Sequence, residues 1–172
     1  MPLEMQNHIF DTLMEAGEEF NLKPFGIRAM DSLRIEKSYR LVGTELSIEY
    51  AAYESGLDRF IHPNKGDFIG RDALVQWRER GFDNSFVTLE VHGVTDADAL
   101  GNNPIYSNDQ VVGRATGGNY GFRVQKSIAL GMVKPEYAEI GTKLQMDILG
   151  NLHEVTVIQE SPYDPENHKL RA

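Results

Sequence analysis

The side chains best suited to bind a small anionic ligand are the four arginines among the first 60 residues: Arg28, Arg34, Arg40 and Arg59. A guanidinium can hold a carboxylate through two parallel hydrogen bonds, and its plane can stack on an aromatic ring. The spacing itself points to a plainer role, because Arg28 precedes Asp31 by three residues, as in ion pairs on a helix face. Exposed pairs of this kind are common and weak. From spacing alone, we interpret all four arginines as surface residues or as members of ion pairs on a helix face.

Three further patterns resemble chemical motifs but lack a required member. The glycine-rich run at residues 117–121 has neither the Lys-Ser/Thr pair of a phosphate loop nor the spacing of a dinucleotide fingerprint, so we interpret it as a turn in a barrel. Asp96 and Asp98 resemble the start of a calcium loop, but the twelfth position of that loop is Ser107 rather than glutamate. The five histidines are scattered and the chain has no cysteine, so no zinc site is expected. We therefore predict no catalytic and no metal-binding residue.

The composition limits the class of protein. The chain has 172 residues, 41% of them hydrophobic, which is enough for one domain or two small units. Its formal net charge of −9 argues against binding to nucleic acids or anionic membranes, which requires a basic surface. The absence of cysteine excludes disulfides and thiolate catalysis. No apolar run reaches the roughly 18 residues of a membrane span, and the N-terminus lacks the layout of a signal peptide, so we expect a cytoplasmic protein.

The elements that must position these side chains begin with helical periodicity. Apolar residues recur at helical spacing from Met5 to Met14, which predicts an amphipathic helix. A second helix is predicted at residues 27–37. A third is predicted at about residues 71–80, where Gly81 can serve as a C-terminal cap.

After Gly81 the periodicity changes to that of strands. Residues 87–91 and 144–148 alternate apolar and polar side chains, as half-buried strands do. Gly150-Asn151 lies between two such runs and predicts a two-residue hairpin turn, and residues 107–109 predict a second tight turn. Short strands at this spacing predict a small antiparallel barrel.

The expected fold is therefore α+β, with a mixed helical N-terminal part followed by a small antiparallel β-barrel. We place the N-terminal part at residues 1–81, the barrel domain at residues 82–165, and a polar, irregular tail at residues 166–172. No internal repeat or low-complexity segment interrupts this division.

Seven segments spread over nearly the whole chain share their order and spacing with one protein family: residues 25–40, 43–46, 54–60, 65–74, 111–113, 125–131 and 157–160. With these segments the chain resembles the aminomethyltransferases (glycine-cleavage T-protein) and the C-terminal parts of dimethylglycine and sarcosine dehydrogenases. Lys37, Tyr39 and residues 125–127 favour the dehydrogenase branch. Several ordered motifs make the resemblance more specific than any single one.

The resemblance implies transfer of a one-carbon unit from a methylated glycine, such as dimethylglycine or sarcosine, to tetrahydrofolate. In that chemistry the protein orients two reactants and excludes water, and a carboxylate manages the proton. The resemblance also implies that Arg59 contacts folate, because the matching residue in some relatives is aromatic and touches tetrahydrofolate. Arg28 is the second residue that we expect to bind the folate or the substrate. Two positions depart from the family pattern: Arg59 itself, and Met30, where the T-protein has arginine.

The resemblance further places the family's catalytic aspartate, and the glutamate that grips the pterin, in an N-terminal folate-binding half ahead of Met1. We therefore expect this chain to be a C-terminal fragment or a split subunit that is inactive by itself. A partner chain carrying the N-terminal half, or a homo-oligomer, would complete it. Two alternatives remain open: a non-catalytic subunit or interaction module, and a relative of the folate-dependent demethylases that act on a sulfonium substrate.

Overall fold

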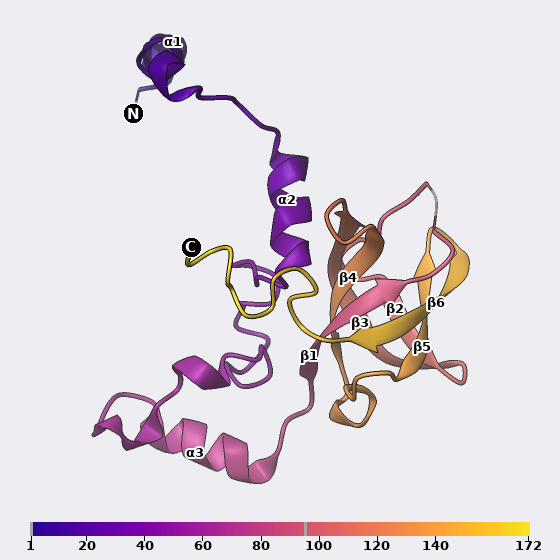
Figure 1. Cartoon of the computed structure of the whole chain (residues 1–172). Helices are drawn as coiled ribbons and strands as arrows, with labels where there is room; N and C mark the ends of the chain where they lie inside the picture. Colours follow the sequence, from indigo (N-terminus) through magenta and orange to yellow (C-terminus); the bar gives the residue numbers. More distant parts are fainter. Residues whose placement is uncertain (1, 95) are drawn as a thin grey trace. The chain divides into compact units, whose positions relative to one another are not determined.

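The structure is a computed structural model that describes residues 2–94 and 96–172 (Figure 1). The chain divides into two compact units, Met1–Met30 and Asp31–Ala172, and the boundary falls inside helix α2 (Ile27–Glu36). The domain boundary that we expect at residues 81/82 lies within the second unit and stays a prediction.

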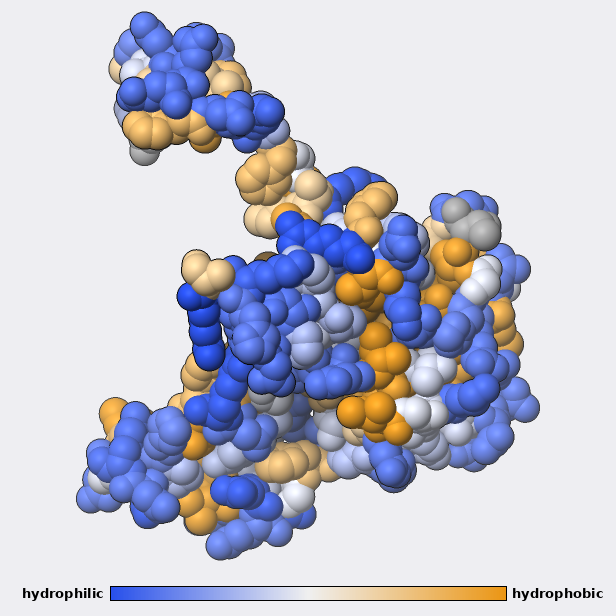
Figure 2. Space-filling view, viewed as in Figure 1, coloured by the Kyte–Doolittle hydropathy of each residue, from blue (hydrophilic) through white to orange (hydrophobic). Residues whose placement is uncertain are grey.

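The first unit contains the predicted amphipathic helix, α1 (Gln6–Ala16), between the short 3-10 turns η1 (Leu3–Met5) and η2 (Glu18–Phe20). The helix ends at Gly17, whose N–H donates to the Leu13 carbonyl at 2.9 Å. Gly17 is required there, because a side chain would collide with Leu22 at 2.4 Å. No residue of α1 is buried, and apolar side chains such as Phe10 and Leu13 are exposed. Figure 2 shows hydrophobic surface on this unit.

The other two predicted helices are also confirmed. Helix α2 ends within one residue of its predicted end, and Ser38, at a positive φ of 54°, turns the chain after it. Helix α3 (Arg71–Arg80) has the predicted bounds. Its cap is Gly81, which adopts a φ of 90° and donates its N–H to the Trp77 carbonyl at 3.2 Å.

Among the described residues, the strands form a closed antiparallel barrel in the order β1-β4-β3-β2-β5-β6 (Figure 1). Their bounds are β1 (Ser85–Val91), β2 (Pro104–Ser107), β3 (Gln110–Gly121), β4 (Lys126–Val133), β5 (Lys143–Ile148) and β6 (Asn151–Ile158). A short 3-10 turn, η5 (Pro135–Tyr137), follows β4. Closure leaves no unpaired sheet edge. The α+β architecture with a small antiparallel barrel is as predicted.

Alternating side chains of these strands fill the barrel. The buried cluster takes Leu89 from β1, Ile105 from β2, Met146 from β5 and Val155 from β6, all fully inaccessible to solvent. The alternation of apolar and polar residues at 87–91 and 144–148 therefore predicts correctly which side chains of β1 and β5 point into the barrel. Burial of this apolar surface is the main stabilising contribution to the barrel.

The β5–β6 hairpin corrects one prediction by a single residue. Its turn residues are Leu149 and Gly150, not Gly150 and Asn151, because Ile148 pairs with Asn151. Both turn residues have positive φ, 52° and 83°, as the favoured two-residue turn requires. The Gly150 N–H donates to the Asp147 carboxylate at 2.7 Å, which helps Leu149 to adopt this strained conformation. The other predicted tight turn is confirmed at Asn108-Asp109.

The glycine-rich run at residues 117–121 is part of strand β3, so its interpretation as a turn is wrong. The strand bulges between Ala115 and Gly117, and the turn comes later, ahead of Lys126. A side chain at Gly118 would collide with Ala99 at 2.8 Å. Glycine is needed here because the segment that contains Ala99 approaches the strand closely. A glycine-rich run can mark either a close approach or a turn, and the sequence pattern alone does not distinguish the two.

A second buried cluster lies on the outside of the barrel. Ile35 of α2 packs against Ile128 and Leu130 of β4, together with Phe86. Strand β4 is therefore buried on both faces. We call residues 31–60, which supply Ile35 and the polar contacts described below, the connecting segment. It is drawn in purple in Figure 1.

Candidate functional site

Two buried glutamates of the connecting segment have the residue type of an acid–base catalyst but are occupied by backbone donors. Glu36 accepts the N–H of Arg123 at 2.6 Å and that of Val124 at 3.3 Å, in the turn between β3 and β4. Glu54 accepts the N–H of Ala51 at 2.7 Å, that of Asp83 at 3.1 Å and that of Asn84 at 2.9 Å. These backbone donors lie in turns and in the residues just before β1, so both glutamates have a structural role.

The third buried glutamate, Glu45, has no exposed surface. It accepts hydrogen bonds from the Leu41 N–H at 2.8 Å, from the Thr44 hydroxyl at 2.6 Å and from the Thr116 hydroxyl of β3. Burial alone would raise the pKa of the Glu45 carboxyl, but the bonds from Thr116, Thr44 and Leu41 outweigh it and hold the pKa below its ordinary value. A carboxylate with a lowered pKa is a poor general base at neutral pH.

Two of the four candidate arginines, Arg34 and Arg40, make contacts that stabilise the fold. Arg34 donates to Asp31 at 2.9 Å and to the Tyr39 carbonyl at 2.8 Å. Arg40 lies 3.9 Å from the centre of the Phe86 ring and donates to the Ser55 carbonyl at 2.8 Å. It also forms an ion pair with Glu160, which links the chain just after β6 to the connecting segment. Both guanidinium groups are mostly buried, so neither is available to a ligand.

The two arginines predicted to bind folate are exposed. Arg28 lies in α2 within the first unit. Arg59 lies in the second unit, in the 3-10 turn η3 (Asp58–Phe60), with its guanidinium 4.7 Å from the centre of the Phe60 ring. Within residues 2–94 and 96–172, neither takes part in an ion pair. Both guanidinium groups therefore remain accessible to an anionic or aromatic ligand.

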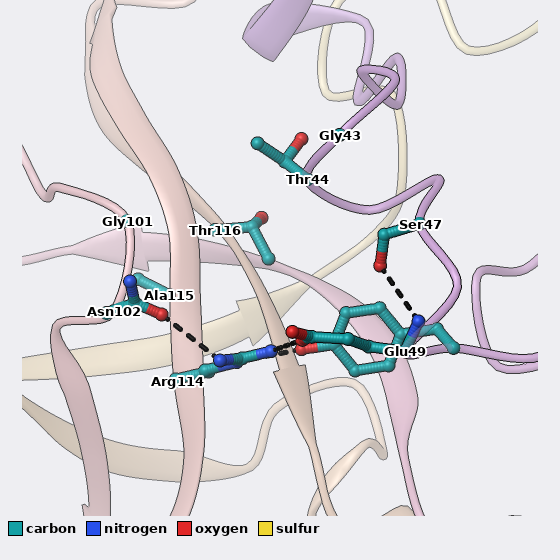
Figure 3. A pocket seen from close by; sticks show the side chains of 10 residues that line it. Gly43, Thr44, Ser47, Glu49, Gly101, Asn102, Arg114, Ala115 and Thr116 are labelled. Atoms are coloured by element: carbon teal, nitrogen blue, oxygen red, sulfur yellow. Dashed lines mark hydrogen bonds and ion pairs between the residues drawn. The ribbon is translucent and has the colours of Figure 1, made fainter.

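A polar pocket of about 210 Å³ lies between the connecting segment and the barrel (Figure 3). Residues 101–102 ahead of β2 and residues 114–116 of β3 line it, together with five residues of the connecting segment: Gly43, Thr44, Ser47, Glu49 and Tyr50. Sequence reasoning missed this pocket. The one signal for it was a charged residue, Arg114, between Gly113 and Ala115 in a strand pattern.

Arg114 is the central cation of this pocket. Its Nε–H donates to the Tyr50 hydroxyl at 2.8 Å and its Nη1 donates to the Asn102 amide oxygen at 3.2 Å, while Nη2 forms an ion pair with Glu49 (Figure 3). The hydrogen bond to Tyr50, and after it the one to Glu49, raise the pKa of Arg114. The guanidinium is therefore charged and held from three sides.

Two other pockets lie on the second unit. One, of about 480 Å³, shares Glu49, Tyr50 and Arg114 with the first and extends to Met132 and Lys134. The other, of about 220 Å³, lies at the β2–β3 turn and contains the exposed Lys143–Glu154 ion pair. Across residues 2–94 and 96–172, no three His, Asp or Glu side chains are placed to hold a metal ion. No helix among those residues has the length and apolar character needed to span a membrane.

Comparison with protein families gives two matches that follow one another along the chain. Residues 1–65 match the GCVT N-terminal domain, and residues 84–164 match the glycine cleavage T-protein C-terminal barrel domain. The second match coincides with the strands of the closed barrel.

Individual relatives agree with these matches. The chain is 37% identical over 153 residues to human mitochondrial dimethylglycine dehydrogenase, covering 88% of the chain and 18% of that protein. It is 31% identical over 169 residues to an aminomethyltransferase of Caldanaerobacter subterraneus, covering 98% and 44%. The crystal structure of the glycine cleavage system aminomethyltransferase T from Bartonella henselae superposes with a TM-score of 0.80 at 19% identity, covering 96% and 45%, which supports the fold. The chain thus spans less than half the length of these relatives.

Proposed function

The chain belongs to the family of the glycine cleavage T-protein, and from that premise we propose that it serves tetrahydrofolate-dependent transfer of a one-carbon unit from a methylated glycine such as dimethylglycine or sarcosine. The observation that carries the proposal is the likeness to dimethylglycine dehydrogenase over 153 residues. That likeness includes both the connecting segment and the barrel, so it extends beyond one shared domain.

In this proposal the chain binds and orients the reactants, and its buried carboxylates do not transfer the proton. Glu36, Glu45 and Glu54 are each engaged by two or more hydrogen-bond donors. A general base at neutral pH needs a raised pKa, whereas the pKa of Glu45 is lowered. Orientation and exclusion of water are contributions that a binding wall supplies without its own acid or base.

The proposed folate contacts are Arg59 and Arg28. Tetrahydrofolate offers a flat ring system and a glutamate tail, and an arginine can stack on the first or bind the second. Arg59 already lies over the ring of Phe60, which leaves the far face of its guanidinium plane for a ligand ring. Arg59 takes part in no ion pair with the residues that the structure describes, so none of those contacts has to be broken first.

The test is a calorimetric titration of tetrahydrofolate into the full chain, alone and together with a candidate N-terminal half. Arg59→Ala should weaken binding by about 1.5–3 kcal/mol, the usual contribution of a charged hydrogen bond, and Arg28→Ala should weaken it too. Arg80→Ala is the matched control, because Arg80 is likewise exposed and lies 5.6 Å from the centre of a neighbouring ring, that of Trp77. Equal and small losses at Arg59 and Arg80 would exclude the assigned folate contact.

A second candidate role is that of a non-catalytic module that associates with another chain. It is favoured by the surface of the first unit, where Phe10, Leu13, Phe20 and Phe25 are all exposed. Exposed apolar patches are often interaction surfaces. Light scattering of the full chain at high concentration, taken together with the tetrahydrofolate titration, distinguishes the two roles. A chain that stays monomeric and binds tetrahydrofolate by itself contradicts the role of an interaction module.

A further inference from the structure

Residues 160–169 follow β6 and cross the end of helix α2, and we call them the strap (yellow in Figure 1). The Tyr163 N–H donates to the Glu36 carbonyl at 3.0 Å, and the Ser161 hydroxyl donates to the Lys37 carbonyl at 2.7 Å. The last carbonyls of a helix have no partner within the helix itself. The strap therefore supplies hydrogen-bond donors to the C-terminal end of α2.

The side chain of Lys37 fastens the strap. Its ammonium group donates to the Tyr163 carbonyl at 3.2 Å, to the Asp164 carbonyl at 2.7 Å and to the Asn167 amide oxygen at 2.7 Å. These three acceptors match the three N–H donors of a lysine side chain. A turn within the strap arranges them, because the Asn167 N–H donates to the Asp164 carbonyl at 2.9 Å. One ammonium group thus binds a set of oxygens that the strap itself brings together.

Other cations lie against the strap on either side of Lys37. Arg123, in the turn between β3 and β4, has its guanidinium 4.7 Å from the centre of the Tyr163 ring. At the start of the strap, Glu160 forms the ion pair with Arg40. The strap contains three acids and one lysine, so an acidic segment covers these cations. We call Lys37 and Arg123 the cationic surface.

The strap can open without unfolding the rest of the chain. None of its residues is buried, and it adds none to the two buried clusters that the described residues form. Segments with few buried apolar contacts open locally, at a fraction of the free energy of global unfolding. Ser161, Asp164 and Asn167 have positive φ values of 57°, 47° and 57°, a conformation that costs free energy for residues other than glycine. Opening relieves this strain.

We propose that the strap is an internal ligand, and that an acidic segment of a partner protein binds the cationic surface in its place when the strap opens. Such a segment presents oxygen acceptors to the Lys37 ammonium and an aromatic ring to Arg123, as the strap does. An attached segment has a high effective concentration, so the strap shields the surface until it is weakened or outcompeted. The inference uses neither Arg59 nor Arg28, so its failure is distinguishable from failure of the proposed folate contacts.

The test begins by opening the strap while the surface beneath it stays unchanged, in the full chain carrying Tyr163→Ala and Asn167→Ala. These changes remove the ring that faces Arg123 and one acceptor of Lys37. The amide protons of residues 161 and 163 should then exchange with solvent about tenfold faster or more, because their acceptors lie across the opened contact. The amide proton of Met146 in the barrel should keep its protection.

A fluorescently labelled synthetic peptide of residues 159–172 is the probe for the vacated surface. In an anisotropy titration it should bind the opened chain about tenfold more tightly than the wild type, or more, because the wild-type strap occupies the surface. A peptide with alanine at both substituted positions should bind the opened chain weakly. The comparison measures whether the surface binds in trans the segment that it binds in cis.

Substitutions in the surface identify the contacts. Added to the opened chain, Lys37→Met should weaken peptide binding about tenfold or more, since it removes a charged donor. Arg123→Gln should weaken it about threefold or more through loss of the cation over an aromatic ring, and Arg123 is exposed, so this change does not endanger the fold. Lys126→Met is the matched control and should leave binding unchanged, because Lys126 is exposed and pairs with Glu90 at 2.6 Å.

Three results overturn the proposal. The first is unchanged amide exchange at residues 161 and 163 in the opened chain. The second is an opened chain that does not bind the peptide. The third is equal peptide affinity in Lys37→Met and Lys126→Met.

Discussion

The inside of the barrel and its outer junction with the connecting segment are both buried, but different interactions stabilise them. Inside the barrel, apolar side chains such as Leu89 and Met146 pack together. At the junction, the carboxylates of Glu36, Glu45 and Glu54 accept hydrogen bonds from backbone N–H groups and hydroxyls. An apolar core tolerates volume-conserving exchange, whereas a buried carboxylate cannot be shortened without leaving its donors unsatisfied.

The difference shows that residue type alone does not separate a catalyst from a residue that supports the fold. Glu36, Glu45 and Glu54 each lie in one of the segments that carry the family resemblance. Their residue types are those of catalysts, yet their partners are turns and strand ends of the same chain. The charged groups that a ligand can reach are at the surface, as Arg59 and Arg114 are.

The largest expected effect comes from placing a charge inside the barrel. Met146→Asp puts an unpaired carboxylate at a position with no solvent exposure, which should remove most of the stability and abolish the cooperative thermal transition measured by circular dichroism. Met146→Leu is the control and should cost less than about 1.5 kcal/mol, because it nearly conserves volume. A cooperative transition that survives in Met146→Asp would show that this face is not the core.

An intermediate effect is expected at the junction. Glu54→Ala leaves the N–H groups of Ala51, Asp83 and Asn84 without their acceptor, which should lower the free energy of unfolding by about 3 kcal/mol. Glu54→Gln keeps one acceptor oxygen and should cost less.

Hydrogen exchange locates the effect of Glu54→Ala. The amides of Asp83 and Asn84 should lose protection first, while those of Met146 and Val155 in the barrel keep theirs. Uniform loss of protection in both regions would mean that the junction and the barrel core are not energetically distinct.

The smallest expected effect is a pH dependence at Glu45. Its pKa is lower in the folded chain than its ordinary value of 4.5, so the unfolded chain binds this proton more readily. The stabilisation is thus fully present above pH 4.5 and is lost as the pH falls below that value toward the folded pKa. Denaturant unfolding between pH 7 and pH 3 should show a shallower decline in Glu45→Gln than in the wild type. Identical slopes would contradict the assigned role of Glu45.

The fold could largely be predicted from periodicity. Helix α3 with its Gly81 cap, and the inward faces of β1 and β5, follow from local pattern. The second face of β4 could not be predicted, because nothing in the strand pattern shows that Ile35 covers Ile128 and Leu130. The predicted position of the β5–β6 turn was wrong by one residue, since the turn uses Leu149 and leucine is unusual at positive φ.

The candidate site could be predicted only in part. The resemblance singled out Arg59, Arg28 was the second candidate, and both are exposed as a binding role requires. Spacing could not separate them from Arg34 and Arg40, whose partners Tyr39, Ser55 and Glu160 are contacts of the folded chain. Arg114 was missed because its pocket joins residues more than 60 positions apart in the sequence, as its ion pair with Glu49 shows.

The most direct test is to follow the arginine Nε–H resonances of the ¹⁵N-labelled full chain during a titration with tetrahydrofolate. We expect the Arg59 resonance to shift, and that of Arg28 with it, while those of Arg34 and Arg40 stay in place because their guanidinium groups are held within the fold. Shifts at Arg34 or Arg40 with none at Arg59 would contradict the division between structural and ligand-binding arginines.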